Sequence, residues 1–118
     1  MELVEPKGNG DRATQDLVPV YARRLEVRPA DHTALVDGRP LSLTLTELQL
    51  LSELAHNLER VMTRGELCER VWRRPYRKSD RSVDVYVGRL RAKLERALPG
   101  RRFIHTHTGI GYRFSAQT

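Results

Sequence analysis

The sequence predicts an α+β fold in which a small antiparallel sheet precedes three helices and a β-hairpin ends the chain. Three observations carry this prediction. Apolar and polar residues alternate between residues 24 and 45, as they do in half-buried strands. Two capping boxes then open segments with helical periodicity, and a third helical segment follows. Alternation returns after residue 101, on both sides of a glycine-rich turn.

The length of 118 residues suits one domain. Residues 1–20 are polar and interrupted by Pro and Gly, which predicts a flexible interdomain linker or tail, with the folded domain over 21–118. No secretory signal and no apolar run of about 18–20 residues is present, so we expect a cytoplasmic protein without a membrane partner. The single cysteine, Cys68, is expected to be a small buried side chain.

Positive charge is concentrated in one third of the chain. The net charge is +6, and residues 73–102 alone contain eleven Lys and Arg against three acidic residues. Clustered cations of this kind are typical of nucleic-acid binding, because phosphate contacts provide most of the sequence-independent affinity. An acidic protein surface or an anionic lipid would attract the same cluster, so composition alone leaves the partner open.

The N-terminal half predicts a sheet of three or four strands. Residues 24–28 and 41–45 alternate between apolar and polar side chains, and residues 33–36 form a second strand-like run between them. Asp37-Gly38 separates the second and third runs, and this dipeptide favours a two-residue hairpin turn in which both residues have positive φ. The strands are therefore expected to be antiparallel, with one apolar face.

Two capping boxes begin the first two helices. Thr44 and Glu47 predict a helix from about residue 45 to residue 56 or 57, and Thr63 and Glu66 predict a shorter one. The buried face of the first helix is expected to carry Leu48, Leu51, Leu54, Ala55 and Leu58. That of the second is expected to carry Leu67, Cys68, Val71 and Trp72.

A third, basic helix is predicted from a cap at Ser79 or Asp80 to Pro99-Gly100. Its buried stripe is expected to be Val83, Val87, Leu90, Leu94 and Leu98. Another face carries Ser82, Val85, Tyr86, Arg89 and Lys93, and such a basic face is either solvated or meets an anionic partner. Asp84 is expected to pair with a nearby arginine.

Residues 102–108 and 112–114 predict a hairpin around Gly109-Ile110-Gly111. Two helices with a short connection, the later one long and basic, followed by a hairpin, form the layout of a winged helix-turn-helix. In that fold the last helix can enter a major groove and the hairpin, or wing, can reach a minor groove. We therefore expect a winged helix-turn-helix with an N-terminal antiparallel β-sheet, three helices and a C-terminal β-hairpin wing.

Four runs in matching order resemble the effector domain of OmpR/PhoB-type bacterial response regulators. They are Leu43-Thr44-Leu45-Thr46-Glu47-Leu48 with Leu50-Leu51, Arg64-Gly65-Glu66-Leu67 with Val71-Trp72, Arg81-Ser82-Val83-Asp84-Val85 with Arg89-Leu90-Arg91-Ala92-Lys93-Leu94-Glu95, and Gly109-Ile110-Gly111-Tyr112-Arg113-Phe114 preceded by Ile104 and Thr106. The resemblance implies a transcription factor that binds double-stranded promoter DNA, often as two copies on direct repeats, under a phosphorylatable receiver domain. About 20 upstream residues are too few for a receiver, so an isolated effector domain is expected.

The resemblance also implies site residues. It assigns base contacts to the outer face of the third helix, at Arg81, Ser82, Val85, Tyr86 and Arg89. Arg89 is best suited to bidentate recognition of guanine, and Val85 and Tyr86 suit thymine methyl groups. Phosphate contacts fall to Trp72, Arg91 and Tyr112, with Lys93 and Arg113 added for their charge. Trp72 and Tyr112 have packing as an equally weighted alternative.

Three positions depart from the family pattern. Gly88 stands where a basic residue is frequent, and Thr108, in a wing that also includes Gly109 and Gly111, replaces an arginine that commonly enters the minor groove. Arg73 replaces a glycine. The resulting basic loop, with Arg73, Arg74, Arg77 and Lys78, is expected to contact phosphate or RNA polymerase.

Other functions are less well supported by the sequence. The main alternative is a winged helix that docks on an acidic protein such as RNA polymerase, and binding to an anionic membrane ranks third. His105 and His107 share a strand face without an apparent third metal ligand, and no nucleophile or metal motif is present. We therefore expect no enzyme, no cofactor, no metal and no small-molecule substrate.

Overall fold

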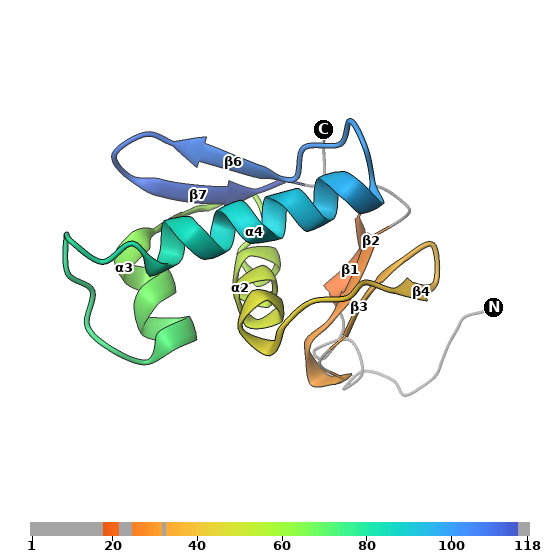
Figure 1. Ribbon diagram of the computed structural model, residues 1–118, viewed down its shortest axis with the longest axis horizontal. Coiled ribbons are helices and arrows are strands. Elements are labelled where there is room, and N and C mark those ends of the chain that lie inside the picture. The colour runs from red at the N-terminus through yellow and green to blue at the C-terminus, as the bar shows by residue number, and fades with distance from the viewer. Residues whose placement is uncertain (1–17, 22–24, 32, 116–118) are drawn as a thin grey trace.

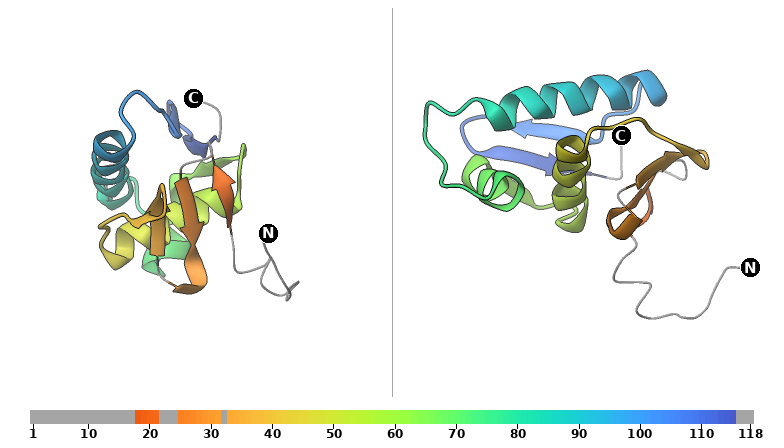
Figure 2. Two further views of the ribbon diagram at one scale, coloured as in Figure 1. Left: turned by 90° about the vertical axis from the view of Figure 1, so that its right-hand side faces the viewer. Right: turned by 60° about the horizontal axis from the view of Figure 1, so that its bottom comes forward.

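The computed structural model describes residues 18–21, 25–31 and 33–115, and it confirms the predicted order of sheet, helices and hairpin (Figure 1). In chain order the elements are β1 (Val18–Tyr21), β2 (Leu25–Arg28), a 3-10 turn (Pro29–Asp31), β3 (Thr33–Val36), β4 (Arg39–Pro40), α2 (Leu45–His56), β5 (Val61–Thr63), α3 (Arg64–Leu67), a π-helical turn (Cys68–Trp72), α4 (Ser82–Ala97), β6 (Ile104–His107) and β7 (Gly111–Phe114). The helix α4 runs alongside the β6–β7 hairpin, and the N-terminal sheet lies at the end of the molecule away from the loop between α3 and α4 (Figures 1 and 2).

The N-terminal sheet is antiparallel, with the strand order β1-β2-β3-β4. Asp37 and Gly38 have φ of 53° and 81°, which confirms the predicted two-residue turn. The third predicted strand lies earlier in the chain than expected. The prediction of a strand over 41–45 was wrong: the strand that pairs with β3 is Arg39–Pro40, and the Leu41 N–H continues the pairing with a hydrogen bond of 2.7 Å to the Ala34 carbonyl. Residues 41–44 are irregular because α2 already begins at residue 45.

The strand β1 starts inside the segment that was predicted to be a linker. It pairs with β2, with Val18 opposite Val27 and Tyr21 opposite Leu25. Its β-branched and aromatic residues favour a strand, and the edge position tolerates Pro19. Residues 1–17 of the predicted linker lie outside the described residues.

The first predicted capping box is present at the start of α2. The Thr44 hydroxyl accepts a hydrogen bond from the Glu47 N–H at 3.2 Å, and the Glu47 carboxylate accepts one from the Thr44 N–H at 2.9 Å. The helix ends at His56, as predicted, with Asn57 as its C-cap. Leu58 lies beyond this end and is exposed, so its predicted place on the buried face was wrong.

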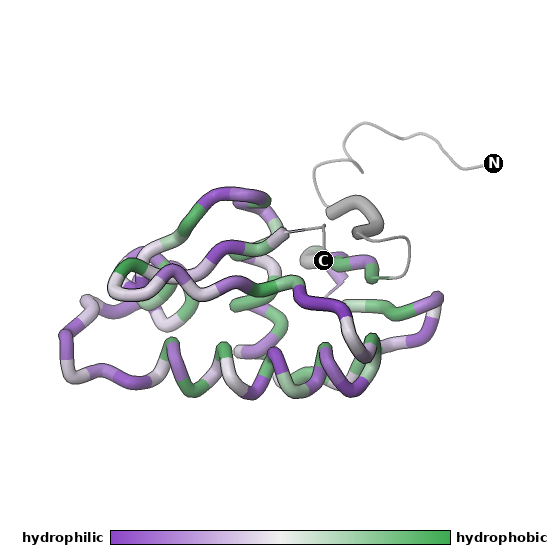
Figure 3. The backbone as a smooth tube through the Cα atoms, turned by 90° about the horizontal axis from the view of Figure 1, so that it is seen from above, coloured by the Kyte–Doolittle hydropathy of each residue, from purple (hydrophilic) through white to green (hydrophobic). Residues whose placement is uncertain are grey.

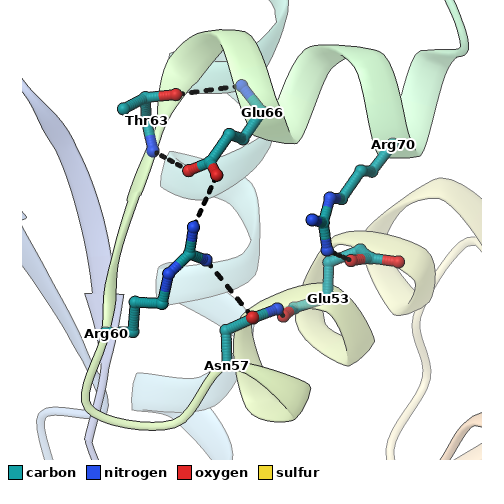
Figure 4. A network of polar contacts seen from close by, with 6 residues as sticks. All are labelled: Glu53, Asn57, Arg60, Thr63, Glu66 and Arg70. Carbon is teal, nitrogen blue, oxygen red and sulfur yellow. Dashed lines mark hydrogen bonds and ion pairs between the residues drawn. The ribbon is translucent and has the colours of Figure 1, made fainter.

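The strand β5, between α2 and α3, was not predicted. It pairs with β7, and its three residues are too few to show a periodicity. Figure 4 shows the polar network that holds this connection. The Glu66 carboxylate accepts hydrogen bonds from the Thr63 N–H (3.0 Å) and from Arg60 (2.6 Å), and Arg60 also donates to Asn57 (3.2 Å). The second predicted capping box is thus tied to the end of α2.

The helix α3 begins at Arg64, as the capping box predicted, and widens after one turn into the π-helical turn. Leu67, Cys68 and Val71 are buried and Trp72 is partly buried, as expected. The turn ends at Arg73, whose φ of 59° and ψ of 40° are left-handed. Glycine favours this conformation, which explains why a glycine is common at this position in the family that the sequence resembles.

The helix α4 buries the predicted stripe of Val83, Val87, Leu90 and Leu94, with Leu98 as its C-cap. Hydrophilic and hydrophobic residues alternate along its length (Figure 3). Arg81 is the N-cap residue but makes no side-chain cap, whereas the Asp80 carboxylate accepts a hydrogen bond from the Ser82 N–H at 2.9 Å. Across the part of the chain that the structure describes, no helix is long and apolar enough to cross a membrane.

The predicted hairpin is confirmed as β6 and β7, which join β5 in a sheet of order β5-β7-β6. Gly111 lies opposite Thr63, and a Cβ atom there would come within 1.9 Å of the Met62 carbonyl oxygen. Only glycine fits this close approach of two strands.

Candidate nucleic-acid interface

The five residues predicted to contact bases lie on the first turns of α4 or at its cap. Arg81, Val85 and Arg89 are exposed, and Ser82 and Tyr86 are partly buried. Positions 82, 85, 86 and 89 share one face of the helix, because side chains three, four and seven residues apart align. Val85 is 45% exposed and supplies an apolar side chain to this face. The face therefore combines cations with an apolar surface, as contact with base edges and thymine methyl groups requires.

Aromatic and cationic side chains pack in a row beside this face. The Trp72 and Tyr86 rings meet edge to face, with centroids 5.4 Å apart. The Arg74 guanidinium lies 6.0 Å from the Trp72 centroid, and that of Arg89 lies 4.9 Å from the Tyr86 centroid. Cation–π contacts of this kind favour one orientation of a long side chain. Arg89 thus packs against Tyr86 on the same face of α4.

Asp84 anchors α4 to α3 and to the wing. Its carboxylate accepts hydrogen bonds from the Arg64 Nε at 2.8 Å and from the Tyr112 hydroxyl. Burial raises the pKa of Asp84, but these two donors outweigh burial and the pKa lies below its usual value. Asp84 therefore stays ionised and pairs with an arginine, as the sequence predicted.

Tyr112 was predicted to contact phosphate or to pack, and the structure shows packing. Its side chain is buried, with Arg64 and Arg91 over its ring at 5.1 and 5.5 Å. Its only O–H proton is donated to Asp84. A phosphate oxygen can only accept, so contact with Tyr112 would require that bond to break.

Arg91 and Lys93, two further predicted phosphate contacts, already have partners within the protein. Arg91 donates to the Ile104 carbonyl (2.9 Å) and the Thr106 hydroxyl (2.6 Å), which fixes the wing to α4. The Lys93 Nζ lies 2.6 Å from the buried Glu47 carboxylate, which fixes α4 to α2. An arginine has five N–H donors and a lysine three, so phosphate contact stays a prediction for both.

Arg113 and Trp72 complete the predicted phosphate set. The Arg113 Nη1 lies 2.8 Å from Glu59, and its Nε donates to the His107 Nε2 at 3.1 Å, a nitrogen that must be unprotonated to accept. Trp72 is partly buried against Tyr86, so its predicted packing role is present.

The basic loop divides into two kinds of residue. Arg73, Arg77 and Lys78 are exposed and pair with no acidic residue among the described parts of the chain. Arg74 instead forms an ion pair with Asp80 at 2.7 Å. Three cations of the loop are thus available to a partner, and the fourth forms an ion pair within the domain.

The wing tip is a turn of Thr108, Gly109 and Ile110, and Gly109 has a φ of 78°. Ile110 is 56% exposed. None of these three residues is cationic, since Thr108 stands where the resembled family commonly has an arginine, and weak contact of this wing with the minor groove stays a prediction.

The cysteine that the sequence singled out lies in the π-helical turn, and the two histidines lie in β6. Within the described ranges, no group of three or more His, Cys, Asp or Glu residues could hold a metal ion. Cys68 is buried, as predicted, and burial raises the pKa of its thiol. Burial also lowers the pKa of His105, which favours the neutral ring.

Sequence reasoning missed Arg64 and the pair of Glu47 with Lys93. Arg64 meets Asp84 across 20 positions of sequence, and Lys93 meets Glu47 across 46. Neither separation leaves a periodic signal. The sequence contained one indication of the second pair: Glu47, the glutamate of the first capping box, lies on the buried side of α2.

Comparisons with known proteins agree with this geometry. Residues 38–114 match the family model described as transcriptional regulatory protein, C terminal. The chain is 42% identical over 88 residues to the response regulator MprA of Mycolicibacterium vanbaalenii, covering 75% of this chain and 38% of the relative. It is 34% identical over 100 residues to the phosphate regulon transcriptional regulatory protein PhoB of Pseudomonas aeruginosa, covering 85% and 43%. The chain spans less than half the length of these relatives.

Solved structures show the same fold. The DNA-binding domain of CpxR from E. coli is 31% identical and superposes with a TM-score of 0.76. The superposition covers 86% of this chain and 98% of that domain. The DNA-binding domain of RstA from Klebsiella pneumoniae, solved in complex with the RstA box, is 30% identical with a TM-score of 0.71, covering 79% and 92%.

Proposed function

The chain belongs to the family of the C-terminal domain of transcriptional regulatory proteins, the DNA-binding effector domain of response regulators, and from this premise we propose that α4 reads promoter DNA in the major groove. The observation that carries the proposal is the outer face of α4, where Arg81, Val85 and Arg89 are exposed beside Ser82 and Tyr86. Arg89 donates two hydrogen bonds to guanine O6 and N7, and Val85 and Tyr86 contact thymine methyl groups.

The surrounding cations contact the DNA backbone. Arg73, Arg77 and Lys78 are exposed at the end of α4 that enters the groove, and they reach phosphates or an acidic patch of RNA polymerase. Arg91, Lys93 and Trp72 contribute phosphate contacts along the flank, and Arg113 does so from the wing. Two copies bind neighbouring direct repeats in the cytoplasm.

The test is selection of DNA sequences by the protein itself. A random duplex pool is enriched for bound sequences, and the selected duplex and a scrambled duplex are titrated by fluorescence anisotropy at physiological salt. Two good base contacts, each contributing about 1–3 kcal/mol, predict a preference of about 30-fold or more for the selected duplex. The logarithm of affinity should fall with the logarithm of salt concentration by about 0.9 for each phosphate neutralised.

Equal and weak affinity for both duplexes would reject this function. That result would favour the alternative of a winged helix that docks on an acidic protein. The matched family is one of DNA-binding regulators rather than enzymes, and we propose no catalytic role.

A further inference from the structure

Arg74 differs from the other cations of the basic loop because its guanidinium has partners within the domain, although 43% of its side chain is exposed. Its Nη2 lies 2.7 Å from the Asp80 Oδ2 and 3.0 Å from the Ser82 Oγ, so one nitrogen makes both contacts. Its carbonyl oxygen lies 3.6 Å from the buried Cys68 Sγ, whose single S–H also has the Asp80 Oδ2 at 3.7 Å and the Pro75 carbonyl at 4.0 Å within reach. The guanidinium of Arg74 is therefore fixed against Asp80 and Ser82.

Asp80 links Arg74 to the first turn of α4. Its Oδ1 accepts the Ser82 N–H at 2.9 Å, one of the N–H groups that a helix start leaves without a partner, while its Oδ2 accepts from Arg74. The Ser82 N–H and the Arg74 guanidinium lower the pKa of Asp80 to about 2. The carboxylate is therefore ionised at any pH at which the protein would bind DNA.

A second path joins Arg74 to the predicted guanine contact. Its guanidinium lies over the Trp72 ring, which meets the Tyr86 ring edge to face. The Arg89 guanidinium in turn lies over the Tyr86 ring. Arg74 thus touches Ser82 directly and reaches Arg89 through two aromatic rings.

We propose that Arg74 is a positioning residue for base recognition, which sets the first turns of α4 through Asp80, Ser82 and Trp72 rather than contacting phosphate or polymerase itself. This inference rests on the proposed function. Base contacts determine sequence preference and phosphate contacts determine affinity for any sequence, so the two roles of an arginine are separable by measurement. A site held to within a fraction of an ångström by its supporting residues loses discrimination when that support is removed.

The experiment compares Arg74→Met with Arg77→Met, which removes the same charge from an exposed loop position. The dissociation constants for the selected and the scrambled duplex are measured at several salt concentrations. We expect Arg74→Met to lower the preference for the selected duplex about tenfold, as the loss of one base contact does. It should leave affinity for the scrambled duplex within about twofold and the salt slope unchanged. Arg77→Met should weaken both duplexes equally and reduce the salt slope by about 1.

Two further variants separate positioning from a general loss of structure. Arg74→Lys should recover most of the preference, because a single nitrogen makes both hydrogen bonds of the Arg74 side chain and a lysine keeps a cation near Trp72. Asp80→Asn and Arg74→Met should be non-additive, so that the double variant loses no more preference than Arg74→Met alone. The melting temperature of each variant is measured first, and the titrations are carried out at a temperature at which every variant is folded.

The inference is overturned if Arg74→Met behaves like Arg77→Met, if Arg74→Lys recovers nothing, or if the two substitutions add. A wild-type protein without sequence preference would instead reject the proposed function. Wild-type preference that survives Arg74→Met unchanged would reject the positioning role alone.

Discussion

Replacing Lys93 by Met tests whether this lysine belongs to the scaffold of the domain. Its Nζ lies 2.6 Å from the Oε1 of Glu47, a carboxylate that is only 2% exposed and that also caps α2 through the Thr44 N–H. Methionine keeps the length and the apolar stem of lysine but leaves the carboxylate without its cation. The substitution therefore leaves a buried charge poorly compensated.

The expected loss of stability is about 2 kcal/mol at pH 7. Removal of one partner from a buried ion pair costs about 3–5 kcal/mol. The cost is lower here because Lys93 is 30% exposed and Glu47 keeps its capping hydrogen bonds. For a domain of this size, about 2 kcal/mol lowers the melting temperature by about 8–16 °C.

The loss should depend on pH. Burial raises the pKa of Glu47, but the hydrogen bonds from Lys93 and the Thr44 N–H outweigh burial, and the pKa lies below its ordinary value of 4.5. Stability from ionised Glu47 is thus fully present above the unfolded-state pKa and is lost as the pH falls through the folded-state pKa. Without Lys93, burial raises the folded-state pKa of Glu47, so lowering the pH stabilises the folded state of the variant. The difference between the two proteins should narrow between pH 7 and pH 4.

Chemical unfolding in urea at both pH values measures this difference. Lys78→Met is the matched control, because Lys78 is exposed on the loop, and it should change stability by less than about 0.5 kcal/mol. Equal stability of the two variants at pH 7 would refute the reasoning, as would a difference that grows in acid.

Three further substitutions act on the backbone, and thermal unfolding measures each. Arg73→Gly should stabilise the domain by about 1 kcal/mol because Arg73 has a φ of 59°, and Arg77→Gly should not. Gly88→Ala should stabilise α4 by about 1 kcal/mol, since a Cβ there meets nothing within 4 Å, and a loss of stability would contradict this account. Gly111→Ala should destabilise by about 3 kcal/mol or more, because its Cβ would meet the Met62 carbonyl at 1.9 Å; a loss no larger than that of Gly109→Ala would disprove the close approach.

The sequence predicted the elements that carry their own local signal. The two capping boxes, the Asp37-Gly38 turn and the buried stripe of α4 all depend on residues a few positions apart, and each is present as predicted. The elements β1 and β5 were missed because they are short and because their pairing with β2 and β7 depends on tertiary contacts.

The same distinction applies to the candidate site. The outer face of α4 followed from helical periodicity, which needs no knowledge of the rest of the fold. The internal partners of Arg91, Lys93 and Tyr112 could not be predicted, because they lie on elements 13 to 46 positions away. Charge alone cannot distinguish a cation that faces a partner from one that holds the domain together.

The most direct test of major-groove recognition by α4 is the affinity of Arg89→Ala for the selected and the scrambled duplex. Arg39→Ala is the control, because it removes the same charge from an exposed strand in the N-terminal sheet. Loss of a bidentate contact with guanine predicts about 5- to 150-fold weaker binding to the selected duplex. Binding to the scrambled duplex should weaken about twofold, and Arg39→Ala should change neither. An Arg89→Ala protein that keeps the full preference for the selected duplex would contradict the account.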